Sequence, residues 1–236
     1  MSGDPQDLSR PGLYRQLGSY SESAYAVLKH AIITLELPPG SRLGIRELRA
    51  RTALGAGPLR EALARLAGER LVNAASQRGF TVAPISRAEL AQLAKLRAML
   101  EAATVADAVS RGEAGWLARI EIALAAFTGE AQGVGETRPL TEHWDYSHRS
   151  FHMTLMSGCG EPVMLDLAEA VYDRFDRYRR LGIPQRGYLA GVKDDHAELV
   201  QCAIAGDAET ARAVVVRHVM DVSAILDGNI AWEKRP

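Results

Sequence analysis

The chain has 236 residues, nearly half of them hydrophobic, and a formal net charge of −1, so it can form one large or two modest domains. Its only cysteines, Cys159 and Cys202, are far apart, which excludes a disulfide scaffold or a cysteine zinc finger and suits a reducing cytoplasm. No apolar run approaches the ~18 residues of a membrane span, and the polar N-terminus lacks a signal-peptide core, so we expect a cytoplasmic protein with no membrane partner.

The N-terminal third is expected to hold an arm followed by three short helices. Residues 1–19 are polar and contain proline and glycine, which predicts a flexible N-terminal arm. Apolar residues at helical spacing predict a first helix over 23–35, and Leu37-Pro38-Pro39-Gly40 ends it because proline cannot continue a helix. A second helix is expected over 45–52. A third has Pro58 in its first turn, where the missing N–H costs nothing.

A hairpin should follow the third helix. Residues 71–73 and 80–82 are short apolar strands, and Arg78-Gly79 lies near the tip between them. This order within residues 20–85 predicts a winged helix-turn-helix, a module that inserts a helix into the major groove of DNA. A generic helical subdomain is the alternative.

Charge and arginine placement support the DNA-binding interpretation. Residues 20–85 hold nine Lys and Arg against five Glu, a local charge of +4, so the remainder carries −5. A basic front module on an acidic body offers a surface for phosphates, although ordinary scatter of surface charge is the alternative. The helical phase places Arg46 and Arg60 outward, and arginine suits bidentate contacts to guanine or phosphate.

Residues 20–85 resemble the GntR family of bacterial transcription factors in the order and spacing of these motifs. The resemblance implies that Arg46 and Arg60 contact operator bases or phosphates and that Arg78 and Gly79 belong to the wing. One departure concerns the residues before Pro58. The family usually has a hydroxyl residue, Arg and Thr there, whereas this chain has Gly55-Ala56-Gly57. A DNA-contacting arginine is therefore missing at Ala56, and the helix cap is only glycine.

The remainder of the chain, residues 86–230, reads as helix throughout. Glycine-containing segments separate stretches that each carry an apolar stripe, and strand patterns are absent, so a compact helical bundle is expected. We therefore predict a mainly α protein: an N-terminal winged helix and a C-terminal all-helical bundle. The expected helices span 87–111, 113–127, 140–156, 162–181, 188–205 and 208–227.

Four of the six histidines lie on apolar stripes of this bundle. His148 and His152 are four residues apart on one helix face. His196 lies ten residues before Gly206 and His218 twelve after it, so a helical hairpin turning at Gly206 would bring both to a similar height. Inward imidazoles at one level can converge on a metal ion. For any single histidine, a hydrogen-bonded core residue is the alternative.

The bundle resembles the FCD ligand-binding domain of the FadR subfamily of GntR regulators. The resemblance rests on Leu96-Arg97 with Glu101, on Phe151-His152 before Gly160-Glu161-Pro162, and on Gly206-Asp207 before His218. Many members of the subfamily hold a divalent metal with one Asp and three His. Carried over to this sequence, the ligands are His152, His196 and His218, with His148 at the position of the Asp.

An all-nitrogen ligand set favours Zn²⁺ or Ni²⁺ over Mg²⁺ or Ca²⁺, which prefer oxygen. Asp145 is a possible substitute ligand, although it lies nearly two turns from His152. The resemblance also implies that Arg97 binds the carboxylate of an effector. A salt bridge between Arg97 and Glu101, four residues later, is the alternative. The basic run at 174–180 is expected to face solvent, with Arg174 or Arg177 lining a pocket as the alternative.

These observations predict a dimeric, ligand-responsive transcriptional regulator that binds a pseudo-palindromic operator and senses a small organic acid. A metalloenzyme is the rival, with Glu169 or Asp195 as acid or base, but the sequence has no HExxH motif. A structural DNA-binding protein without an effector would leave the inward histidines unexplained. The sequence names neither the effector nor the operator, and it does not distinguish a repressor from an activator.

Overall fold

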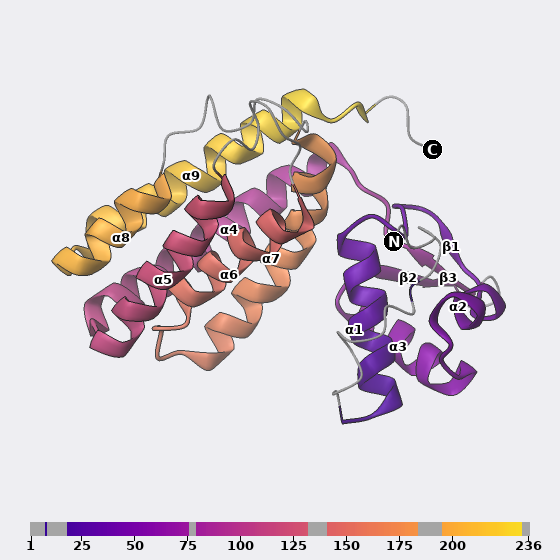
Figure 1. Ribbon diagram of the computed structural model, residues 1–236. Coiled ribbons are helices and arrows are strands. Elements are labelled where there is room, and N and C mark those ends of the chain that lie inside the picture. The colour runs from indigo at the N-terminus through magenta and orange to yellow at the C-terminus, as the bar shows by residue number, and fades with distance from the viewer. Residues whose placement is uncertain (1–7, 9–17, 76–78, 132–140, 184–194, 233–236) are drawn as a thin grey trace. The chain divides into compact units, whose positions relative to one another are not determined.

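The computed structural model describes residues 8, 18–75, 79–131, 141–183 and 195–232, without the side chains of 75 and 129–131. The chain divides into two compact units (Figure 1). Residues up to Ser86, with the segment from Trp232, form the first unit, and Arg87–Ala231 form the second. The first is a small mixed domain and the second is all-helical in its described residues, so the predicted mainly α class is confirmed.

The first unit is a winged helix-turn-helix. Its helices are α1 (Tyr20–Ile33), α2 (Ile45–Thr52) and α3 (Ala56–Gly68). Three antiparallel strands, β1 (Arg42–Leu43), β2 (Val72–Ala75) and β3 (Gly79–Val82), form a sheet in the order β1-β3-β2. Strand β1 was not predicted, because a pair of residues is too short to show an alternating pattern.

Local chemistry explains most boundaries of this unit. Ser19 caps α1 by accepting a hydrogen bond from the backbone N–H of Glu22. Helix α3 begins at Ala56, so Pro58 lies in its first turn as predicted. One face of each helix is buried in a common core, and Leu8, within the expected flexible arm, is also buried there and donates its N–H to the Arg51 carbonyl at 2.9 Å.

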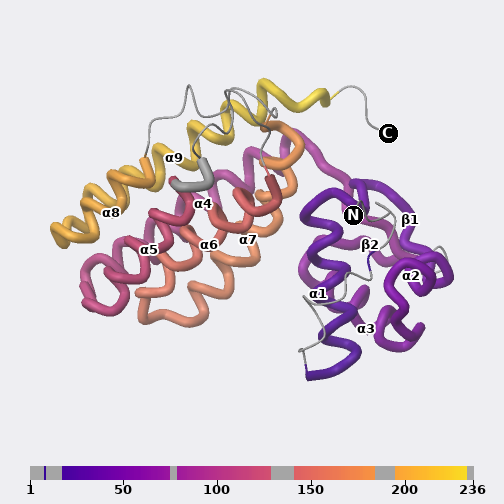
Figure 2. The backbone as a smooth tube through the Cα atoms, in the orientation of Figure 1, coloured from indigo at the N-terminus to yellow at the C-terminus, as the bar shows by residue number. Residues whose placement is uncertain are grey.

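The second unit is a bundle of helices in its described residues. They are α4 (Arg87–Arg111), α5 (Ala114–Ala131), α6 (Glu142–Met156), α7 (Pro162–Gly182), α8 (Asp195–Ala205) and α9 (Ala208–Asn229). The backbone trace shows these helices running beside one another, with α9 packed along α4 (Figure 2). The predicted helix over 188–205 is described only from Asp195 onward. No helix among the described residues is long and apolar enough to cross a membrane.

The basic run on α7 does not face solvent as a whole, so that prediction was wrong. Arg177 and Arg179 are almost completely buried. Two hydrogen-bonded ion pairs hold the Arg179 side chain, which donates to Asp145 at 2.6 Å and also to Asp176. Carboxylates interleaved with the arginines therefore allow this face of α7 to enter the bundle.

Candidate metal centre and DNA-binding surface

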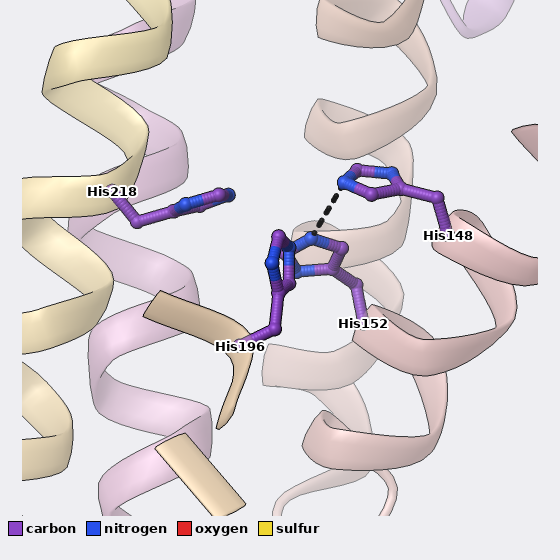
Figure 3. A group of neighbouring side chains, drawn as sticks. All are labelled: His148, His152, His196 and His218. Carbon is purple, nitrogen blue, oxygen red and sulfur yellow. Dashed lines mark hydrogen bonds between the residues drawn. The ribbon is translucent and has the colours of Figure 1, made fainter. Parts of the chain in front are cut away.

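Four histidines meet inside the second unit. His148 and His152 come from α6, His196 from α8 and His218 from α9, and all four are buried. Each offers one ring nitrogen to a group whose atoms all lie within 4.8 Å of one another. Figure 3 shows the four imidazoles pointing toward a common centre. Among the residues that the structure describes, this is the group of side chains suited to hold a metal ion.

Helix geometry accounts for this convergence. Residues four apart on α6 share one face, so both of its histidines point into the bundle. Helices α8 and α9 meet at a tight turn where Gly206 has a φ of +69°, a conformation that glycine adopts without a steric penalty. The turn folds α9 back along α8 and brings His196 and His218 to a ring-centroid distance of 4.8 Å.

One nitrogen–nitrogen distance in the group matches a tetrahedral transition-metal site. Nε2 of His148 lies 3.3 Å from Nε2 of His152. Ligands bound to zinc at about 2.0–2.1 Å in a tetrahedron are separated by about 3.3 Å. Aromatic side chains surround the group and limit access by water: Phe127, Trp144, Phe151 and Tyr172.

The environment keeps the imidazoles of His148, His152 and His218 neutral, which is the form that binds a metal. Burial holds the pKa of His148 and of His152 well below the ordinary value, and neighbouring positive charges act in the same direction. Burial also lowers the pKa of His218, to about 4, although the nearby Asp195 opposes the shift. Nitrogen lone pairs are therefore available near neutral pH.

Two other predicted site residues form ion pairs. Asp145 lies outside the histidine group, because its carboxylate accepts from Arg179 and from Arg180, each at 2.6 Å. Arg97 is buried and pairs with Glu101 through its Nε and, at 3.3 Å, its Nη2. The salt bridge weighed as the alternative for Arg97 is thus present.

The candidate DNA-binding residues of the first unit are exposed. Arg46 lies on α2 and Arg60 on α3, and neither side chain forms an ion pair with the described part of the chain. Gly79 opens β3 with a φ of +80°, which favours glycine. Arg78, also predicted to contact DNA, lies outside the described residues. Gly55 caps α3 without a side-chain hydrogen bond, as its sequence implies.

Comparison with known protein families assigns both units of the chain. Residues 20–82 match the bacterial regulatory proteins of the gntR family, and residues 92–221 match the FCD domain. The chain belongs to the GntR family. Its C-terminal bundle is an FCD domain, in agreement with the resemblance seen in the sequence.

Relatives of this GntR protein are transcriptional regulators. The chain is 32% identical over 215 residues to the HTH-type transcriptional repressor GlaR of Escherichia coli K12, covering 89% of this chain and 97% of GlaR. It is 30% identical to the uncharacterised HTH-type regulator BphR of Paraburkholderia xenovorans, covering 85% and 82%. The structure of E. coli McbR/YncC has the same fold, with a TM-score of 0.73 over 89% of this chain and 98% of that one, at 22% identity.

The chain is therefore a transcriptional regulator that binds DNA through its winged helix and carries a small-molecule effector domain. It is not an enzyme, and the metalloenzyme alternative has no support. Glu169 and Asp195, the acid-base candidates of that alternative, pair with Arg149 and Arg217, each at 2.6 Å. From the sequence, Asp195 was considered only as an acid or base of that alternative, although it stands directly before His196.

Proposed function

We propose that this GntR regulator uses a metal-containing FCD domain to sense a small organic acid and thereby changes its affinity for operator DNA. The observation that carries the proposal is the convergence of four buried histidine nitrogens within 4.8 Å. Such a group is costly to bury unless hydrogen bonds or a metal ion satisfy the nitrogens. The regulator would act in the cytoplasm, where bacterial operators lie.

The metal is proposed to be Zn²⁺ or Ni²⁺, held by His148, His152, His196 and His218. Imidazole suits these ions, whereas Mg²⁺ and Ca²⁺ prefer oxygen ligands. His148 stands where the family usually has an aspartate, so the ligand set of this chain carries no negative charge. The charge of a bound ion would then remain uncompensated among its ligands, which favours an anionic effector close by.

The effector is proposed to be a small carboxylate that contacts Arg97 as well as the metal. Arg97 lies near the histidines, because its partner Glu101 approaches Nδ1 of His152 at 3.8 Å. A guanidinium has five N–H donors, so an ion pair through Nε and Nη2 does not exhaust them. Coupling to DNA requires that the acid bind one state of the regulator more tightly than the other.

The DNA-binding form is proposed to be a homodimer on a pseudo-palindromic operator. Half-sites about one helical turn apart match a two-fold partner. Exposed apolar side chains on α4 and α9 offer a surface for a second copy, and α4 and α9 pack on each other. This surface, called the α4/α9 apolar face, comprises Leu96, Met99, Val216 and Met220, which are 40–69% exposed.

A binding experiment tests the proposed function. Duplexes selected by the full-length protein from a randomised pool supply a binding sequence. Affinity for that duplex is then measured for metal-free and Zn²⁺-loaded protein, each with and without a panel of short mono- and dicarboxylates. We expect at least one acid to change the affinity of the loaded protein and none to change that of the metal-free protein. An acid response that is equal without metal would refute the coupling.

A further inference from the structure

Three of the four histidines have an oxygen atom close to Nδ1. The Tyr172 hydroxyl lies 3.2 Å from Nδ1 of His148. Asp195 Oδ2 lies 3.4 Å from Nδ1 of His218, and Glu101 Oε2 lies 3.8 Å from Nδ1 of His152. Both are ion-pair distances, and the buried Nδ1 of His218 has no hydrogen bond of standard geometry to the described residues. Each oxygen comes from a different helix, α7, α8 or α4, so the pattern does not arise from one local turn.

Arginines hold both carboxylates in place. Arg217 donates from Nη2 and Nε to Asp195 Oδ1, at 2.6 and 3.2 Å, which leaves Oδ2 directed at His218. Arg97 holds Glu101 through both carboxylate oxygens, because its Nε donates to Oε1 and its Nη2 donates at 3.3 Å to Oε2, the oxygen that approaches His152. Asp195 and Glu101 are only 1% and 2% exposed. A buried carboxylate needs such partners, and the pairing fixes which of its oxygens faces the imidazole.

The chemistry of a neutral imidazole gives these contacts a consequence. It carries one N–H, on either Nδ1 or Nε2, and an ionised carboxylate can only accept a hydrogen bond. An ionised carboxylate beside Nδ1 therefore favours the tautomer with hydrogen on Nδ1, whereas a hydroxyl, such as that of Tyr172 beside His148, can donate to Nδ1 as well as accept. In His152 the lone pair is then on Nε2, which can accept a hydrogen bond from Nε2 of His148 at 3.3 Å.

We propose that Asp195 and Glu101 are positioning residues that hold His218 and His152 in the Nδ1–H tautomer and so direct Nε2 toward the metal. The inference rests on the proposed metal site. Outer carboxylates of this kind orient metal-binding histidines and raise their basicity. They also place negative charge beside a ligand set that has none of its own.

A merely structural role for Asp195 is the competing explanation, because its ion pair with Arg217 joins α8 to α9. Three variants separate the two roles. Asp195→Asn removes the obligate acceptor, since an amide can donate as well as accept. Arg217→Lys loses the two-nitrogen contact but keeps a charged partner for the carboxylate. Glu198→Gln is the matched control, because Glu198 accepts from the same Arg217 nitrogen at 2.5 Å but is largely exposed.

The first readout needs no metal. Nitrogen-15 spectra of the metal-free, full-length protein report the tautomer of each histidine. We expect Nδ1–H on His218 in the wild type, in Arg217→Lys and in Glu198→Gln, and a mixture in Asp195→Asn. Nε2–H in the wild type, or an unchanged His218 in Asp195→Asn, would overturn the proposal. If Asp195→Asn does not fold, Glu101→Gln with His152 as the reporter gives the same decision.

The second readout is the affinity for Zn²⁺ alone, measured in competition with a chromophoric chelator. Asp195→Asn should bind Zn²⁺ about 10–100-fold more weakly, while Glu198→Gln stays at the wild-type value. Equal losses in both variants would contradict a positioning role. A wild-type protein that binds no Zn²⁺ would refute the proposed metal site, whereas the metal-free spectra would still decide the tautomers.

Discussion

Nε2 of His148 and Nε2 of His152 face each other at 3.3 Å inside the bundle. Both rings are buried, and burial holds the pKa of each below the ordinary histidine value. One N–H can join these two nitrogens in a hydrogen bond. That bond does not include His196 or His218, whose ring centroids lie 5.3 and 5.4 Å from that of His152. A metal ion at the shared centre would bind all four rings at once, as proposed above.

DNA binding should depend on the exposed arginines of the winged helix. We expect Arg46→Ala and Arg60→Ala to weaken binding to the selected duplex by about 1–3 kcal/mol each, because each removes a charged contact to a base or phosphate. Fluorescence anisotropy at fixed salt measures the change. Arg119→Ala on α5 removes an equal charge from the other unit and should bind like the wild type. Unchanged affinity in both test variants would contradict the assignment.

The acid response should depend on Arg97. Replacement by alanine would leave Glu101 buried without its partner and would confuse folding with binding. Arg97→Lys keeps the charge and loses the bidentate fork. We expect this variant to retain metal but to bind an effective carboxylate about tenfold more weakly, as seen in melting shifts at several acid concentrations. A wild-type acid response in Arg97→Lys would remove Arg97 from the effector site.

Dimerisation should depend on the α4/α9 apolar face. Met99→Glu together with Met220→Glu places charges on the two helices at positions that are 69% and 42% exposed in the single chain. We expect the wild type to be a dimer at micromolar concentration by light scattering and the double variant to be a monomer with unchanged helix content. Ile122→Glu, at another exposed apolar position, should stay dimeric. A dimeric double variant would place the interface elsewhere.

Acid should weaken the ion-pair network on α7. Burial alone would raise the pKa of Asp176, but Arg179 and Arg180 lower it below its ordinary value. A carboxyl whose pKa is lower in the folded state stabilises the fold above its unfolded pKa of about 3.9, and this contribution is lost as the pH falls through the folded value.

The matching variant is Asp176→Asn, which we expect to lower the free energy of unfolding at pH 7 by roughly 3 kcal/mol. The difference from the wild type should shrink below about pH 4. Urea titrations across this range measure both effects. Asp166→Asn, on an exposed part of the same helix, is the control and should change little. A difference that is constant with pH would show that packing rather than charge is responsible.

The sequence predicted the elements well where local rules decide them. Residues 45–52 and 87–111 form helices with the expected bounds, because proline, glycine and apolar spacing mark their ends. The histidine convergence could also be anticipated, since it follows from helical phase and from the turn at Gly206. Strand β1 could not, because its pairing with β3 depends on residues nearly forty positions away.

The prediction that failed depended on ion pairs between residues far apart in the sequence. The arginines of α7 look like a solvated run, yet Arg179 is buried because Asp145, from α6, neutralises it. Packing between helices likewise brings Asp195 close to His218 and Glu101 close to His152. A single sequence does not reveal which carboxylate will face which ring.

The central claim is that the four histidines hold a metal ion, and metal content tests it most directly. Full-length protein purified without chelator or nickel resin is assayed by elemental analysis and by melting with added Zn²⁺ or Ni²⁺. We expect one divalent transition metal per chain, a higher melting temperature on loading metal-free protein, and loss of both in His196→Ala. His143→Ala, which changes an exposed histidine of α6, should keep both. Sub-stoichiometric metal in the wild type, with no melting shift on adding either ion, would contradict the claim.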